Sequence, residues 1–188
     1  MTMPDFKKFS EEINVEFNDI NLLKRACTHR SYLNENKKAG LEHNERLEFL
    51  GDAVLELVVT SFLFRKYPDR DEGDLTSYRS ALVNTTSLSK VALHIGVDKY
   101  LLLSKGESKD ASSKARNIII ANAMESLIGA IYLDQGYAGA KQFVEEFVLV
   151  KLPYILEHKL YQDPKSRFQE EAQARLNVTP VYKVISEI

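Results

Sequence analysis

The chain has 188 residues, of which 44% are hydrophobic and 28% are charged. This composition is sufficient for a buried core and excludes a low-complexity or largely disordered chain. The formal net charge is −2, from 25 Lys and Arg residues against 27 Asp and Glu residues. Proteins that bind nucleic acids usually carry a basic excess, so the overall charge argues against that class unless basic side chains gather on one surface.

No feature of the sequence indicates secretion or membrane insertion. Cys27 is the only cysteine, which excludes an intrachain disulfide bond. Asp5, Lys7 and Lys8 stand where a secretory signal would be apolar. No apolar run approaches the roughly 20 residues that a membrane-spanning helix needs. We therefore expect a cytoplasmic protein with no membrane partner.

The spacing of apolar residues is helical along most of the chain. Phe6, Phe9 and Ile13 predict a first helix, and Asp19 is placed to cap a second, which should close at 29–32. A polar loop follows. The pattern then predicts helices over 44–67, 73–96, 115–133 and 138–152, with a polar loop at 105–114 and a turn at 134–136. Together these elements predict an all-α fold.

The last part of the chain has a different pattern. Residues 156–162 are predicted to be a linker between a domain at 1–155 and a second unit at 163–188. Within that unit, 166–176 has the spacing of an amphipathic helix, and 181–185 alternates as a strand does. One helix and one strand cannot bury a core alone. We therefore expect the C-terminal part of the second unit to be missing.

An acidic stripe lies on the helix predicted over 44–67. Glu45, Glu48 and Asp52 are spaced i, i+3 and i+7, so at ~100° per residue they share one helix face. Like charges on one face repel, and no Lys or Arg follows four residues after Glu45 or Glu48. A hard divalent cation is the natural compensation.

A second group of oxygen donors lies on the helix predicted over 115–133. Asn122 and Glu125 are again three residues apart, and Gly129 continues the same face. Gly129 and Gly51 would each allow another helix to approach closely. Two facing helices would then place Glu48, Asp52, Asn122 and Glu125 around one site. Oxygen ligands without His or Cys favour Mg²⁺ or Mn²⁺ over zinc.

Structural explanations compete with this metal-site hypothesis. Glu45 stands where a carboxylate is favoured at a helix N-terminus, directly after a capping Asn44. A charge stripe on a helix is commonly a solvated face. Glu125 lies in a strongly apolar segment and fits that explanation poorly. A di-iron bundle is the rival metal site, but it needs Glu-x-x-His pairs, and the sequence has none.

The segment Asn44 to Leu55, NERLEFLGDAVL, resembles the signature helix of bacterial ribonuclease III. Similar to the same family are THRSY at 28–32, GDLT at 73–76, KGE at 105–107 and ESLIGAIYLD at 125–134. The segment DPKSRFQE at 163–170 resembles the start of an α/β double-stranded-RNA-binding domain. The resemblance covers essentially the whole chain.

The resemblance implies a helical endonuclease domain that acts as a homodimer on double-stranded RNA. It implies Mg²⁺ dependence, with Mn²⁺ as a possible substitute, and products with 5′-phosphates and two-nucleotide 3′ overhangs, processed from ribosomal RNA precursors and some mRNAs. Glu48 and Glu125 match direct metal ligands, and Asp52 matches the acid that orients the attacking water or shares the metal. Glu45 matches an acid of lesser, outer-shell role. Phe49 matches an aromatic side chain that inserts into the partner subunit, although an ordinary core Phe gives the same pattern.

The sequence departs from the family at one site position, since Asn122 stands where the family usually has Asp. An amide still offers a carbonyl oxygen but removes one negative charge. In the second unit, Gln169 and Glu170 lie on the first helix and match residues that reach ribose hydroxyls, with a solvated helix face as the equal alternative. The rival function is a non-catalytic RNA-binding scaffold of the same fold. Retention of Glu48, Asp52 and Glu125 favours the enzyme.

Overall fold

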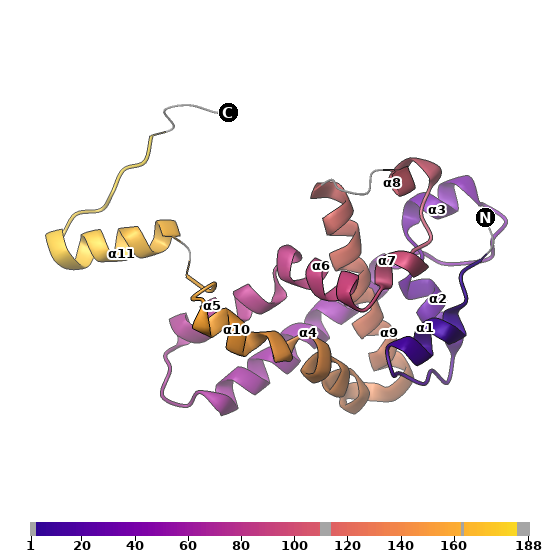
Figure 1. Cartoon of the computed structure of the whole chain (residues 1–188), viewed down its shortest axis with the longest axis horizontal. Coiled ribbons are helices and arrows are strands. Elements are labelled where there is room, and N and C mark those ends of the chain that lie inside the picture. Colours follow the sequence, from indigo (N-terminus) through magenta and orange to yellow (C-terminus); the bar gives the residue numbers. More distant parts are fainter. Residues whose placement is uncertain (1–2, 110–113, 163, 184–188) are drawn as a thin grey trace.

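The computed structural model describes residues 3–109, 114–162 and 164–183. Regular structure in these ranges is helical, which confirms the predicted all-α fold, and the only β feature there is an isolated parallel bridge between Thr28 and Leu102. Figure 1 shows the helices in chain order. They are α1 Phe6–Glu12, α2 Ile20–Ala26, α3 Arg30–Glu35, α4 Glu45–Lys66, α5 Glu72–Val83, α6 Thr85–His94, α7 Val97–Tyr100, α8 Lys105–Lys109, α9 Lys114–Phe147, the 3₁₀ turn η1 Leu149–Lys151, α10 Leu152–Glu157 and α11 Pro164–Leu176.

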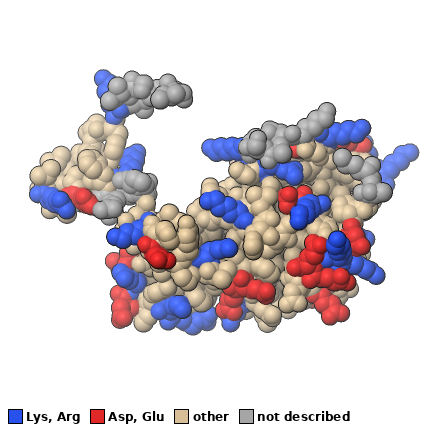
Figure 2. Space-filling model, in the orientation of Figure 1, with Lys and Arg blue, Asp and Glu red and all other residues tan. Residues whose placement is uncertain are grey.

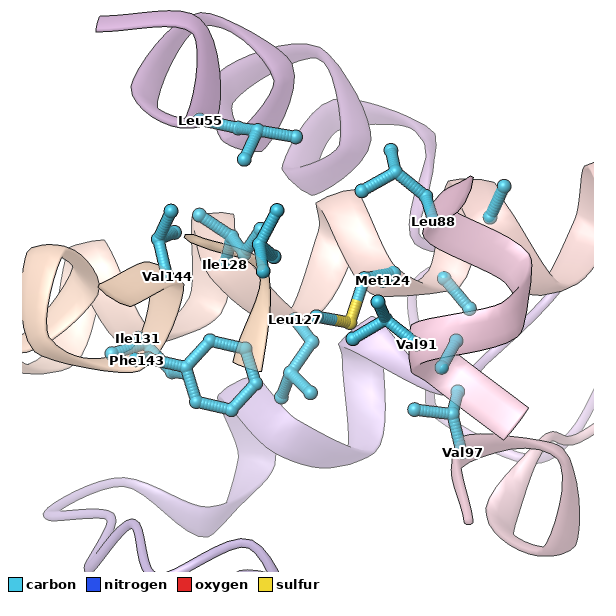
Figure 3. Packing of buried hydrophobic residues seen from close by; sticks show 14 of the residues in the cluster. Leu55, Leu88, Val91, Val97, Met124, Leu127, Ile128, Ile131, Phe143 and Val144 are labelled. Atoms are coloured by element: carbon cyan, nitrogen blue, oxygen red, sulfur yellow. The ribbon is translucent and has the colours of Figure 1, made fainter. Parts of the chain in front are cut away.

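Helix α9 is the centre of the core. It packs against α4, α6, α2 and α7. Its fully enclosed residues Met124, Leu127, Ile128 and Ile131 are spaced as one helical stripe. Figure 3 shows this stripe beneath Leu55 of α4, and beside side chains from α6, α7 and the C-terminal half of α9. Burying each such side chain stabilises the fold by about 1.5–3 kcal/mol, so α9 holds the surrounding helices in place.

Several predicted helix boundaries are confirmed by the structure. The Asp19 carboxylate accepts the backbone N–H of Asn21 and caps α2, as the sequence indicates. Helix α4 ends at Lys66, before Pro68. The predicted turn at 134–136 is the kink at Gly136, where φ is 72° and α9 changes direction. Glycine adopts this left-handed backbone without the steric cost that a Cβ would bring.

The single helix predicted over 73–96 is wrong, because α5 ends at Val83 and α6 begins at Thr85. Between them Asn84 is extended, with ψ at 157°. Its side-chain oxygen accepts the Ser87 N–H, and its amide donates to the carbonyl oxygens of Ser80 and Ala81. A short amide side chain thus bonds both helix ends and replaces the continuous ladder.

Two further local predictions need correction. Residues 29–32 do not close α2. Instead His29 caps a separate helix, α3, by accepting the N–H of Ser31. The predicted loop at 105–114 begins with the short helix α8, while 110–113 lie outside the described residues. The apolar spacing carries no information on either feature, because both depend on polar side chains bonding nearby backbone.

The C-terminal segment stands apart from the helical body in Figure 1. Its helix α11 confirms the amphipathic helix expected over 166–176. Residues 181–183 do not form the predicted strand, since they pair with no neighbouring strand, and 184–188 lie outside the described part. Upstream, the predicted linker is partly helical, and the ring of Tyr161 packs edge-on against Tyr78 at 4.7 Å. The second unit therefore stays a prediction.

Helices α4 and α9 touch backbone to backbone. A Cβ added to Gly51 would collide with the carbonyl of Glu125 and come within 2.8 Å of the Gly129 nitrogen. A Cβ on Gly129 would collide with the Leu47 carbonyl and lie 3.1 Å from the Gly51 nitrogen. Real Cβ atoms do not approach this closely, so both positions require glycine. The predicted close approach at Gly51 and Gly129 is confirmed.

This contact makes a prediction about stability. Gly51→Ala should lower the free energy of unfolding by about 3 kcal/mol or more, because the methyl group forces α4 away from α9 over their whole contact. Urea denaturation followed by circular dichroism measures the change. Gly106→Ala is the matched control, since its added Cβ meets nothing closer than the Ser104 hydroxyl at 3.9 Å. Equal stability of the two variants would contradict the assigned crossing.

Candidate metal and catalytic site

The predicted acids lie at the point where α4 and α9 cross. Asp52 follows Gly51 on α4, and the carbonyl of Glu125 on α9 is the group that Gly51 leaves room for. Glu48 lies one turn earlier on α4 and interacts with Asn122, one turn before Glu125 on α9. The structure therefore brings together the four residues that the sequence predicts, and the glycine contact fixes their spacing.

Glu125 is the most perturbed acid of the site. Burial among apolar neighbours raises the pKa of its carboxyl group to about 7, and the negative charges of Asp52 and Glu48 add to the shift. A partly desolvated carboxylate that faces two other acids is what a bound cation would stabilise.

Glu48 shares this environment but has a hydrogen-bonding partner. Desolvation is the main cause that raises the pKa of its carboxyl group, and Glu45 and Asp52 raise it further. A hydrogen bond with the Asn122 side chain acts in the opposite direction. Because a carboxylate only accepts, the Asn122 amide group is the donor. Asn122 therefore removes one charge from the site and also steadies the ionised form of Glu48.

Glu45 is drawn to the edge of the site by basic side chains. Its carboxylate lies 3.7 Å from the Arg30 guanidinium of α3 and 3.7 Å from Nδ1 of His43. Sequence reasoning missed both partners, because Arg30 is brought to α4 only by the fold, and His43, two residues before Glu45, belongs to no pattern that marks it as a partner. Their contacts are consistent with an outer role for Glu45.

Asn44 does not cap α4 as predicted. Its backbone is already in the α-helical region, and its side chain makes no capping bond. The buried amide donates instead to the Ala26 carbonyl oxygen, 3.2 Å away. On the opposite side, the Ser126 hydroxyl of α9 lies 3.3 Å from the Asn44 carbonyl oxygen and 2.8 Å from that of Asn122. These bonds tie the first turn of α4 to α2 and α9.

The donor set suits a hydrated hard cation. Carboxylate and amide oxygens are the ligands that Mg²⁺ prefers, and Mg²⁺ keeps several of its waters in proteins. Within the described residues, no group of three His, Cys, Asp or Glu side chains is arranged so that it could hold a metal ion by itself. A site with few direct protein ligands and several metal-bound waters does not need such a set, and the desolvated carboxyl group of Glu125 would gain from a nearby cation. The residues present therefore fit Mg²⁺ or Mn²⁺.

The remaining predicted residues are Phe49, Gln169 and Glu170. Phe49 projects from α4 with 82% of its surface exposed, which excludes the core-Phe alternative for this chain by itself. Gln169 is exposed on α11. Glu170 belongs to the same helix, but its side chain lies outside the described residues. The RNA contacts of Gln169 and Glu170 stay predictions.

A polar network beside the site was not predicted. Nδ1 of His29 lies 2.8 Å from the Ser31 hydroxyl, and that oxygen accepts the N–H of Ser104. The Glu35 carboxylate accepts the next N–H, from Lys105. These bonds hold the start of α8 against α3. The clue in the sequence is only the closeness of His29 and Ser31, because Ser104 is far along the chain.

Comparison with known proteins gives a consistent relationship. A family model described as ribonuclease-III-like matches residues 19–152. The ribonuclease 3 of Enterococcus faecalis is 40% identical over 181 residues, which cover 96% of this chain and 77% of that protein. The ribonuclease 3 of Bacillus velezensis is 44% identical over 183 residues, which cover 97% of this chain and 72% of that protein.

Solved structures agree with the sequence relatives. The nuclease domain of ribonuclease III from Campylobacter jejuni has a TM-score of 0.69 at 38% identity, and the match covers 79% of this chain and 99% of that one. Dicer from Pichia stipitis has a TM-score of 0.55 at 25% identity, over 100% of this chain and 77% of that one. The chain belongs to the ribonuclease-III-like family. It is an endoribonuclease, as the resemblance of its signature helix implies.

The helices of the structure can be compared with what a membrane span requires. Among the helices of the described ranges, none has the length and apolar character to cross a membrane.

The raised pKa of Glu125 predicts how stability depends on pH. Without metal, the folded protein holds the Glu125 proton up to a pKa of about 7, whereas the ordinary value is 4.5. Folded protein therefore binds more protons between these values, and the free energy of unfolding should fall as pH rises through them. Glu125→Gln should flatten this fall by on the order of 1–2 kcal/mol, after allowance for the exposed part of the side chain.

Denaturation midpoints of the metal-free proteins across that pH range measure the effect. Glu146→Gln is the control, because Glu146 is an exposed acid on the C-terminal half of the same helix. Groups other than residue 125 contribute to the pH dependence of every variant, so only the difference between variants is used. If Glu125→Gln keeps the pH dependence of the unsubstituted chain, Glu125 is not the desolvated acid that the geometry indicates.

Proposed function

We propose that the chain is an Mg²⁺-dependent endoribonuclease that cleaves double-stranded RNA, with Mn²⁺ able to replace Mg²⁺. The products would carry 5′-phosphates and two-nucleotide 3′ overhangs, and ribosomal RNA precursors and some mRNAs would be the substrates. The observation that carries this proposal is the group of coupled acids at the helix crossing. Burial and the negative charges of Asp52 and Glu48 raise the pKa of Glu125, and burial with the charges of Glu45 and Asp52 raises that of Glu48.

Each acid would have a separate part in hydrolysis. Glu48 and Glu125 would hold the ion, and the Asn122 amide would keep Glu48 ionised and oriented. Asp52 is exposed beside them and would accept a hydrogen bond from the attacking water, orienting it toward the phosphorus. Glu45, anchored by Arg30 and His43, would set the charge at the edge of the site. The bound ion itself would neutralise charge on the phosphate as the phosphodiester breaks.

Support for a homodimer comes from the exposed face of α4. Phe49, Leu57 and Phe64 are 82%, 56% and 72% exposed, and their spacing places them on one side of the helix. Large apolar side chains exposed in a row usually mark a protein interface. The solved Campylobacter jejuni nuclease domain is described as having a region involved in dimer formation. In this chain a hollow of about 420 Å³ between α4 and α5, beside Phe64, offers room for Phe49 of a second copy.

The rival function is a non-catalytic scaffold that binds double-stranded RNA. A scaffold gains nothing from desolvated acids that repel phosphate and lower stability. Retention of Glu48, Asp52 and Glu125 in one coupled group therefore favours the enzyme. The exposed Gln169 on α11 would add an RNA contact in either case.

The proposal predicts the effect of removing the central acid. Glu125→Ala should reduce cleavage of a long RNA duplex by about 10³-fold or more, since an ion ligand contributes several kcal/mol to the transition state. Folding stability at neutral pH should not fall, because the substitution removes a destabilising charge. The measurement is single-turnover cleavage in Mg²⁺ and again in Mn²⁺, beside the thermal unfolding curve. Glu146→Ala is the control for a lost acid on α9.

Two outcomes would count against this proposal. Full-rate cleavage by Glu125→Ala would show that the acid is misassigned. Binding of the duplex by the unsubstituted protein, with no cleavage in either metal, would favour the scaffold.

Asn122 gives a second prediction of the same function. Asn122→Asp should lower the Mg²⁺ concentration for half-maximal cleavage by up to about tenfold, because it adds a fourth carboxylate to the site. The cut positions should not change, since the RNA contacts are untouched. A metal titration of the cleavage rate and mapping of the product ends measure both effects. Gln142→Glu makes the same charge change far along α9, at an exposed position. An unchanged metal dependence in Asn122→Asp would show that residue 122 does not act on the ion.

A further inference from the structure

A groove of about 570 Å³ lies between α6 and the segment that runs from the end of α9 into α10. It contains none of the residues assigned to the acidic site or to the exposed face of α4. Its floor is apolar and well packed, because Leu82, Val91, Val148 and Ile155 are all buried. Such a floor is preformed, and binding there does not need the core to open.

The apolar surface continues out of the groove onto its rim. Val150, Tyr154 and Leu160 line it and are 59%, 58% and 57% exposed. A contiguous exposed surface of large apolar side chains is uncommon on a protein without a partner for it. The rim and floor together form an apolar strip that a ligand with several apolar side chains would cover.

The charges around this strip are of one sign. Lys90, His94 and Lys151 line the groove, and no Asp or Glu does. In the part of the chain that the structure describes, Lys90 and Lys151 take part in no ion pair between side chains. Figure 2 shows blue side chains beside tan surface over the region of α6 and α10 that Figure 1 labels. A molecule with an excess of acids thus has a local surface that attracts acids.

We propose that this groove binds an acidic amphipathic segment of another protein. The segment would lay its apolar side chains along Val150, Tyr154 and Leu160 and direct carboxylates toward Lys90 and Lys151. Ser87, Lys90 and His94 share one face of α6 and form a wall of the groove, so a segment that lies along α6 would meet all three. The apolar floor favours a protein segment over RNA, because RNA is bound through its phosphates, ribose hydroxyls and stacked bases and buries few aliphatic side chains.

The test is a selection of random linear peptides displayed against the full chain, without RNA. Selected peptides should be rich in Asp and Glu, with apolar residues at helical spacing. The affinity of these peptides for the chain should fall by about tenfold or more in the double variant Lys90→Glu/Lys151→Glu. It should fall similarly in Tyr154→Ser, which removes an apolar side chain from the rim of the groove. Lys7→Glu/Lys38→Glu is the control, because both lysines are exposed and lie outside the groove. Binding should weaken at high salt, and duplex cleavage should be unchanged in every variant.

Other results would overturn the proposal. Selected peptides without an excess of Asp and Glu would contradict the proposal that the partner is acidic. Equal peptide affinity for the charge-reversed and control variants would contradict it as well. Loss of duplex binding in Lys90→Glu/Lys151→Glu, with no peptide selected, would assign the groove to RNA. Because duplex cleavage is measured separately, the groove proposal and the proposed nuclease function can fail independently.

Discussion

The backbone contact between Gly51 of α4 and Gly129 of α9 determines how close the two longest helices lie. Helix axes are normally held 8–10 Å apart by the side chains between them, and glycine at both positions removes that spacer. As a result Asp52, which follows Gly51, lies beside Glu125, whose carbonyl packs against Gly51. The same contact that completes the core therefore brings acids from two helices to one site.

Bringing these acids together costs free energy as long as no metal ion is bound. Desolvation and repulsion from Asp52 and Glu48 raise the pKa of Glu125 to about 7. Strongly perturbed acids of this kind are typical of functional sites, because the environment that destabilises the free carboxylates strengthens their hold on a cation. Asn122 moderates the effect at Glu48 by donating a hydrogen bond. The replacement of a carboxylate by an amide thus changes the balance of the site in two ways, through charge and through hydrogen bonding.

The surroundings of the crossing are built from long-range polar contacts. The buried amide of Asn44 bonds to α2, and the Ser126 hydroxyl reaches the Asn44 carbonyl from α9. Arg30 of α3 and His43 hold Glu45 at the edge. Buried polar groups of this kind are costly when unpaired, so they specify one arrangement of the helices. The acidic face of α4 is thereby fixed in orientation, while the neighbouring apolar side chains of Phe49 and Phe64 are left exposed.

The sequence by itself determined the helical class, the extent of α4 and the cap at Asp19, and it predicted the set of acids, because these follow from periodicity, local capping chemistry and motifs within two helices. It also indicated the roles of Gly51 and Gly129. Only the tertiary structure decided the break at Asn84, the separate helix after His29, the partners of Glu45 and Asn44, and the exposure of Phe49. Each of these depends on contacts, present or absent, between residues that are far apart in the sequence, or on a polar side chain that can bond to either of two backbone groups. The raised pKa of Glu125 belongs with them, since desolvation and repulsion arise only when α4 and α9 are in contact.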